Sequence, residues 1–282
     1  MVQTKHRNRL PLPQPAVVHV RRSYAEGRHG QIHLATAYPS GGGFDERVPI
    51  VCLHPAGGSG RWFGPALREL GRDRSVYAVD LPGHGSSDIS ATRLTIAELA
   101  AVVGDFLDSL RLRSADVIGY ELGAAIAVEL AIVRSQQIRR LLLWGAAVYS
   151  PQERTALAAQ ARASWREDGS ELAELWRHEL EQRPADVPMG ALIDGWSDRL
   201  RAGPAAARAY TAYLEYMAGE RLPLVKQHAL VLRLKDQFGD YAARVRSSLT
   251  NGTLLDVPEH GQGFISAAAQ RFAAIVREFF DR

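Results

Sequence analysis

The sequence predicts an α/β protein with a mostly parallel sheet of about eight strands that is wrapped by helices. Short apolar runs of strand length alternate with amphipathic segments of helix length through residues 48–144 and again through 229–280, and this alternation favours a parallel sheet covered on both faces. Residues 150–224 contain no convincing strand, only helical segments separated by prolines. We therefore expect a helical lid inserted after the sixth strand.

Strands and turns follow from the local patterns along the chain. Residues 17–24 and 31–38 alternate in polarity around a glycine-containing turn, which predicts an antiparallel hairpin at one sheet edge. Later strands are expected at 49–53, 75–79, from 116, at 138–144, 229–234 and 253–257, and helices at 62–70, 95–110, from 122, at 239–249 and 267–280. The expected domains are an N-terminal arm at 1–16, a core at 17–149 and 225–282, and the lid at 150–224.

Composition limits the classes of function. The chain has 282 residues, 46% of them hydrophobic and 23% charged, and a formal net charge of +3 that is scattered along the sequence. Such a charge disfavours nucleic-acid binding, and no stretch is long and apolar enough for a membrane span. The one cysteine, Cys52, lies in an apolar run and is expected to be buried, which fits a reducing cytoplasm. No metal-ligand spacing is present, and we expect no cofactor.

The segment that starts at Asp116 organises the chain. It predicts a strand, then a tight turn Gly119-Tyr120-Glu121-Leu122-Gly123, then a helix. This is the outline of the nucleophile elbow, in which flanking glycines let the central residue adopt a strained backbone on the rim of a sheet. The central residue here is Glu121, a carboxylate where a serine hydroxyl is usual.

Three further motifs accompany this turn. They are His54-Pro55-Ala56-Gly57-Gly58 after the third strand, Asp80-Leu81-Pro82-Gly83-His84-Gly85-Ser86-Ser87-Asp88 after the fourth, and Val257-Pro258-Glu259-His260-Gly261 near the end. In this order and at these spacings the motifs resemble those of the α/β-hydrolase superfamily, of which the chain would be an atypical member.

The resemblance implies a catalytic triad in the order nucleophile, acid, histidine. By position these are Glu121, Asp236 and His260, with Asp240 as a less favoured acid. The oxyanion donors would be the backbone N–H groups of Leu122 and of a residue near Ala56. Substrate-binding positions implied beside this loop are His54, expected mainly to support loop geometry, and Trp62. Tyr210 and Tyr213 are candidates to protonate a leaving oxygen, although tyrosines three apart on a helix more often pack in a core.

A carboxylate at the elbow has three possible roles. Our first hypothesis is that Glu121 and His260 form an acid/base pair that catalyses elimination, cyclisation, isomerisation or C–C cleavage of a small, largely apolar organic molecule. The second is covalent catalysis by Glu121, as in epoxide hydrolases and dehalogenases. The third is a catalytically inactive ligand-binding homologue. No serine lies in an elbow context, so we do not expect a serine esterase. The protein could form a homodimer.

Overall fold

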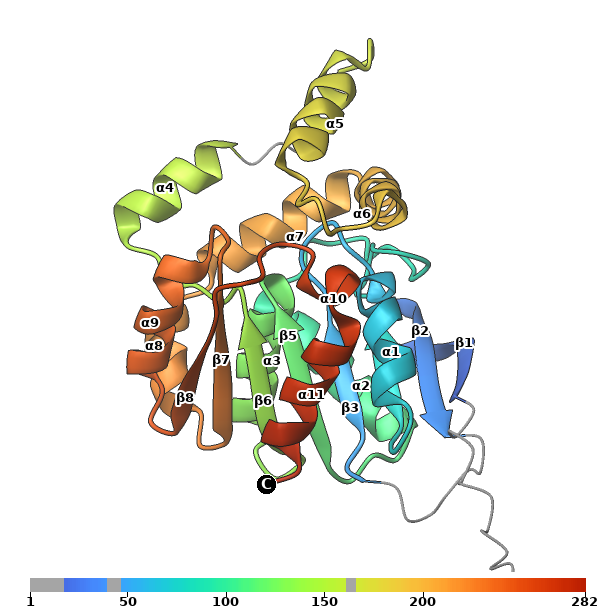
Figure 1. The fold of residues 1–282 in the computed structure, drawn as a ribbon, viewed down its shortest axis with the longest axis vertical. Helices are drawn as coiled ribbons and strands as arrows, with labels where there is room; N and C mark the ends of the chain where they lie inside the picture. Colours follow the sequence, from blue (N-terminus) through green and yellow to red (C-terminus); the bar gives the residue numbers. More distant parts are fainter. Residues whose placement is uncertain (1–17, 40–46, 161–165) are drawn as a thin grey trace, which may run out of the picture.

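The computed structural model describes residues 18–39, 47–160 and 166–282 and contains one eight-stranded sheet, in the order β1-β2-β4-β3-β5-β6-β7-β8 (Figure 1). The strands are β1 (Val18–Gly27), β2 (Gly30–Pro39), β3 (Ile50–Leu53), β4 (Val76–Val79), β5 (Ala115–Tyr120), β6 (Ile138–Trp144), β7 (His228–Leu234) and β8 (Gly252–Val257). β1 pairs with β2 and β2 with β4 in antiparallel fashion, and every other pair is parallel. The predicted α/β class and edge hairpin are therefore confirmed, whereas the expected arm at 1–16 lies outside the described residues.

Helices cover both faces of the sheet and enclose two apolar cores. α1 (Gly64–Leu70) and α11 (Ala269–Phe280) pack on one face, and α2 (Ile96–Ser109), α3 (Leu122–Val133) and α9 (Gly239–Ser248) pack on the other. α3 is apolar except for Glu129, which pairs with Arg221 at 2.7 Å, and it is buried from its first residue to Ala131 because it lies between the sheet and the neighbouring helices. The strand β5 and the helix α3 thus occupy the centre of the molecule.

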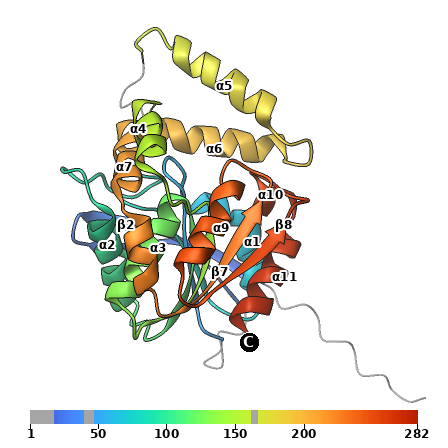
Figure 2. The ribbon, with the colours of Figure 1, turned by 90° about the vertical axis from the view of Figure 1, so that its left-hand side faces the viewer.

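Between β6 and β7 the chain forms a helical insertion. Its helices are α4 (Pro151–Gln160), α5 (Ser170–Gln182), α6 (Met189–Ala202) and α7 (Pro204–Glu215), followed by the short α8 (Ala218–Arg221) and the 3-10 turn η2 (Leu222–Leu224). In Figures 1 and 2, α4 to α7 lie above the end of the sheet where the parallel strands terminate, and α5 is the outermost. Ligands of open α/β sheets bind at this end.

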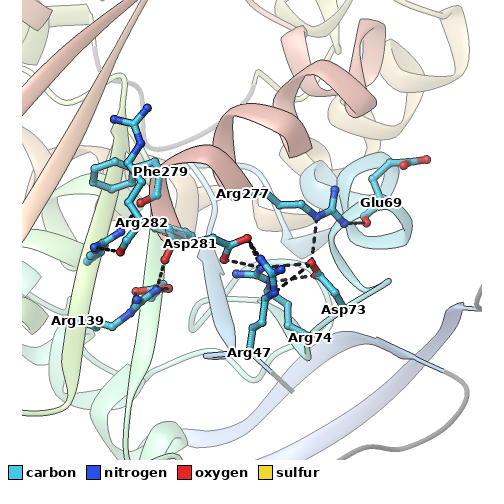
Figure 3. A network of polar contacts seen from close by, with 12 residues as sticks. Arg47, Glu69, Asp73, Arg74, Arg139, Arg277, Phe279, Asp281 and Arg282 are labelled. Carbon is cyan, nitrogen blue, oxygen red and sulfur yellow. Dashed lines mark hydrogen bonds and ion pairs between the residues drawn. The ribbon is translucent and has the colours of Figure 1, made fainter. Parts of the chain in front are cut away.

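The opposite end of the molecule is held by a network of ion pairs (Figure 3). The Arg74 side chain is fully buried, and its guanidinium donates to the carboxylate of Asp73 at 3.0 Å and to that of Asp281 at 2.7 Å. Arg277 pairs with Asp73 at 3.2 Å, and Arg47 pairs with Asp281. Because a buried guanidinium is costly unless paired, this network fixes the end of α11 against the loop that precedes β4.

Two helices differ in detail from the prediction. The segment predicted at 62–70 starts two residues earlier, as the 3-10 turn η1 (Gly60–Phe63). The helix predicted at 267–280 is α11, which starts two residues later than expected and follows a separate short helix, α10 (Phe264–Ala267). In the part of the chain that the structure describes, no helix is both long and apolar enough to cross a bilayer. Nor do the described residues contain a cluster of His, Cys, Asp and Glu suited to a metal ion.

Candidate active site

Glu121 lies at the turn between β5 and α3 with an unusual backbone. Its φ is 50° and its ψ is −108°, outside the regions that side-chain-bearing residues normally occupy. Its N–H donates to the Trp144 carbonyl at 2.9 Å, and its carbonyl accepts from Ala124 at 3.0 Å in the first turn of α3. A strained residue held in this way between strand and helix is typical of a functional position.

Both flanking glycines are required by close backbone approaches. A Cβ on Gly119 would lie 2.4 Å from the Gly123 carbonyl oxygen, and a Cβ on Gly123 would lie 2.0 Å from the Leu53 carbonyl oxygen. The helix α3 can therefore come close to β3 and β5 only with hydrogen at these positions. The glycine pair that predicted the elbow is explained by this packing.

We expect Gly123→Ala to destabilise the protein by roughly 2 kcal/mol, because the added methyl group overlaps main-chain atoms that cannot move aside. Gly195 in α6 is the matched control, since nothing lies within 4 Å of a Cβ built there. Gly195→Ala should stabilise by about 0.5 to 1 kcal/mol, the usual gain in a helix interior. Urea denaturation of the two variants measures both effects, and equal stabilities would contradict the steric explanation.

The Glu121 carboxylate points into the loop predicted to supply oxyanion donors. Its Oε2 accepts the backbone N–H of Ala56 at 2.7 Å, and the side chain is only 8% exposed. Burial raises the pKa of Glu121 from its usual 4.5 to about 7, although the N–H groups of Ala56 and Leu122 and the positive charge of Arg199 act in the opposite direction. The two expected oxyanion donors are thus directed at the protein's own carboxylate.

His260 and Asp236 are brought near each other by the main chain, but their side chains have other partners. The Lys235 N–H donates to the His260 carbonyl at 2.8 Å, which joins the two loops. The Asp236 carboxylate accepts from the Trp144 indole N–H and from the Phe238 N–H, both at 2.9 Å. The His260 ring stacks on Phe264 with ring centroids 4.5 Å apart, and among the described residues its imidazole makes no hydrogen bond.

The hydrogen bond from Asp236 to His260 that the family pattern implies is therefore replaced by one to Trp144. A buried indole N–H needs an acceptor, and Asp236 provides it. The Trp144 ring is buried, and its centroid lies 4.3 Å from the centroid of the Tyr120 ring. The centroids of the Tyr120 and Trp62 rings are 4.8 Å apart. Aromatic packing beside the elbow thus uses the carboxylate that would otherwise orient the histidine.

The other predicted site residues, His54, Tyr210 and Tyr213, are buried or partly buried beside the elbow. His54 is completely buried; its Nδ1 bonds to the Pro55 carbonyl at 2.8 Å, and its Nε2 accepts the Leu81 N–H at 2.9 Å, so both ring nitrogens support the loop. The buried Tyr213 hydroxyl donates to the Gly145 carbonyl at 3.1 Å, and its ring lies 6.1 Å from that of Tyr210. Burial, together with the charge of Glu121, raises the pKa of Tyr210 to about 12.

A pocket of about 230 Å³ opens between the core and the helical insertion. Ala56, Trp62, Tyr120 and Glu121 contribute to its lining from the core, and Asp236 and His260 do not line it. The insertion contributes residues from α5, α6 and the segment between them, and half of these are polar: Glu179, Gln182, Arg183, Asp194, Asp198 and Arg199. The sequence predicted a helical lid in this part of the chain, but not which of its side chains line the pocket.

A buried hydrogen bond joins the insertion to the loop beside Glu121. The Ser59 hydroxyl donates to the Asp198 carboxylate of α6 at 2.6 Å, and Asp198 is only 1% exposed. In the same helix, the Arg199 guanidinium pairs with Glu179 of α5 at 2.7 Å. Through these contacts α6 holds the loop that donates to Glu121 and places a positive charge near its carboxylate.

Comparison with known proteins agrees with this architecture. The family model of the alpha/beta hydrolase family matches residues 50–275. The structure superposes on the enol-lactonase from Burkholderia xenovorans with a TM-score of 0.76 and 18% identity, covering 92% of this chain and 100% of that one. A hydrolase from Pseudomonas aeruginosa gives a TM-score of 0.74 at 20% identity, covering 93% and 98% of the two chains.

Curated relatives share shorter regions. A 2-hydroxymuconate semialdehyde hydrolase from a Pseudomonas species is 34% identical over 117 residues, which are 39% of each chain. The dihydrolipoyllysine-residue acetyltransferase component of an acetoin cleaving system from Cupriavidus necator is 31% identical over 135 residues, 46% of this chain and 35% of that protein. The chain thus spans little more than a third of the length of these two relatives. Because the family model extends from β3 into α11, this protein belongs to the α/β hydrolase family.

Proposed function

We propose that this protein is an enzyme in which Glu121 transfers a proton to or from a small organic substrate bound between the core and the helical insertion. The observation that carries this proposal is the buried Glu121 carboxylate at the pocket wall, with a pKa of about 7. A group with that pKa is present in both protonation states at neutral pH and can act as a general acid or a general base. The corresponding reactions are elimination, cyclisation, isomerisation or C–C cleavage.

Proton transfer agrees better with the site than covalent catalysis does. An attacking carboxylate must be ionised, whereas burial raises the pKa of Glu121 to about 7 and so favours the protonated form. Covalent turnover also needs a base that activates water. The His260 imidazole, the candidate for that task, stacks on Phe264 and does not line the pocket. In our proposal Glu121 is the essential group, and His260 acts only if its ring turns toward the pocket when substrate binds.

One observation favours a second candidate, a ligand-binding protein without catalysis. The Ala56 N–H, a predicted oxyanion donor, is already bonded to the Glu121 carboxylate at 2.7 Å. The Asp236 carboxylate is likewise bonded to Trp144. A pocket can persist in such a chain as a binding site alone.

The proposal is tested by screening organic compounds for turnover and then tracing the oxygen atom of labelled water. Enol lactones, unsaturated keto acids and epoxides are incubated with the protein, and their consumption is measured by mass spectrometry. Activity on one of these classes is expected. A single turnover in ¹⁸O-labelled water should then leave Glu121 unlabelled, because a proton-transfer group forms no ester with the substrate. Label found in Glu121 would establish covalent catalysis instead, and binding without consumption of any compound would support the ligand-binding candidate.

A further inference from the structure

Most charged side chains of the pocket wall are paired with each other, and within the described residues Glu121 and Arg183 are the two without an ion pair. Arg199 pairs with Glu179 at 2.7 Å, and Arg61 pairs with Asp194 at 3.3 Å and with Asp198 at 3.7 Å. Arg183 also lines the pocket. Among the residues that the structure describes, no carboxylate lies within ion-pair distance of its guanidinium. Of the three arginines that line the pocket, Arg183 is therefore the one for which no ion pair is found among these residues.

The Arg183 guanidinium also has a donor without an acceptor. Its Nε–H is buried and finds no hydrogen-bond partner within the described parts of the chain. A buried donor left unpaired costs about 1 to 3 kcal/mol, and a ligand that accepts from it would remove this cost. A carboxylate is the natural acceptor, because its two oxygens match the fork of N–H groups on an arginine.

Arg183 is held in place rather than free to move with solvent. Its Nη1 donates to the carbonyl of Val187, and Val187 is buried against the loop that follows His260. A Cβ added to Gly263 in that loop would lie 2.5 Å from the Val187 side chain. The segment after α5 therefore fixes the guanidinium over the core, and an ordered donor loses less entropy on binding.

We propose that the pocket binds a small organic acid whose carboxylate is held by Arg183 and whose apolar body lies against Trp62 and Tyr120. Trp62, Tyr120 and Trp196 all line the pocket and offer aromatic surface to such a body. The charge at Arg183 revises the expected largely apolar substrate to one with an anionic end. This inference rests on the proposed function, for which it names the class of substrate.

Benzoate is a suitable probe, and benzamide is its neutral counterpart of the same shape. Isothermal titration calorimetry is expected to detect benzoate binding that is stronger than benzamide binding. Arg183→Gln should weaken benzoate binding by at least about tenfold, because a charge-assisted pair is lost, and leave benzamide binding unchanged. Arg183→Lys should retain part of the preference for benzoate, which distinguishes a lost charge from a misfolded insertion. Arg177→Gln, on the exposed side of α5, is the matched control and should bind as the native protein does.

Two results would overturn this inference. One is benzoate binding that is no stronger than benzamide binding in the native protein, and the other is unchanged benzoate binding in Arg183→Gln. Because the measurement involves no turnover, it is independent of proton transfer by Glu121. Benzoate binding that depends on Arg183 in a protein with no activity would reject the proposed function and keep the anion site.

Discussion

Glu121→Gln is expected to lower kcat/KM for the substrate by a factor of about 10² to 10⁴, the usual contribution of a positioned acid or base. Glutamine has nearly the same shape, and its amide oxygen can still accept the Ala56 N–H that now bonds to Glu121 at 2.7 Å. It cannot exchange a proton at neutral pH, so ligand binding should remain while turnover is lost. Steady-state kinetics and calorimetry of the same variant separate the two effects.

The pH dependence of kcat/KM identifies which proton Glu121 moves. Since the pKa of Glu121 is about 7, a general base gives a rate that rises with pH through 7, and a general acid gives a rate that falls there. Either change should disappear in Glu121→Gln. Glu174→Gln is the control, because Glu174 is an exposed residue of α5. Full activity of Glu121→Gln would exclude both the acid/base and the covalent roles.

Glu121→Gln is also expected to make the folded protein more stable at alkaline pH, by roughly 3 kcal/mol relative to the native chain. Folding raises the pKa of Glu121 from 4.5 to about 7. Below pH 4.5 the carboxyl group is protonated in both the folded and the unfolded state, and its ionisation then does not reduce the free energy of unfolding. Between these two pKa values the folded state binds more protons than the unfolded state, so native stability falls as pH rises and levels off above 7. An amide in the same place avoids this loss.

The expected difference is measured by urea denaturation of both proteins at about pH 5 and about pH 8, with linear extrapolation to water. The stability gain of Glu121→Gln should be small at the lower pH and approach its full size at the higher one. A gain that does not change with pH would mean that it comes from packing and not from ionisation. A loss of stability that grows with pH would show that the carboxylate is stabilised by its neighbours instead of destabilised by burial.

Much of the fold could be predicted because its signals are local. Continuous apolar runs such as Ile50 to Leu53 indicate strands buried on both faces, and β6, which contains two arginines before its apolar end, has the predicted bounds. Thr95 followed by Glu98 forms a capping box at the start of α2, within one residue of the expected start of that helix. The short α10 was not predicted, and α11 starts two residues after its expected start, because alanine is a good helix former and the alanines at 267 to 269 mark no helix boundary.

The candidate site was predicted less completely. Spacing and glycines were enough to place Glu121 on the elbow, because the turn geometry depends on residues within two positions of it. The partners of Asp236 could not be predicted in this way. They depend on how Trp144 of a neighbouring strand is buried, which no pattern near residue 236 encodes.

For the helical insertion too, the sequence predicted the helices but not how they pack against the core. From the sequence by itself, the chain is an α/β protein with a carboxylate at a strained turn between strand and helix. Only the tertiary structure decided that α6 places Asp198 against Ser59 and that Arg183, a residue of the pocket wall, has a buried Nε–H without a partner among the described residues. Helical segments are specified by contacts three or four residues apart, whereas their docking depends on contacts between distant residues. The pKa of Glu121 is likewise a tertiary property, since burial by surrounding elements is its main cause.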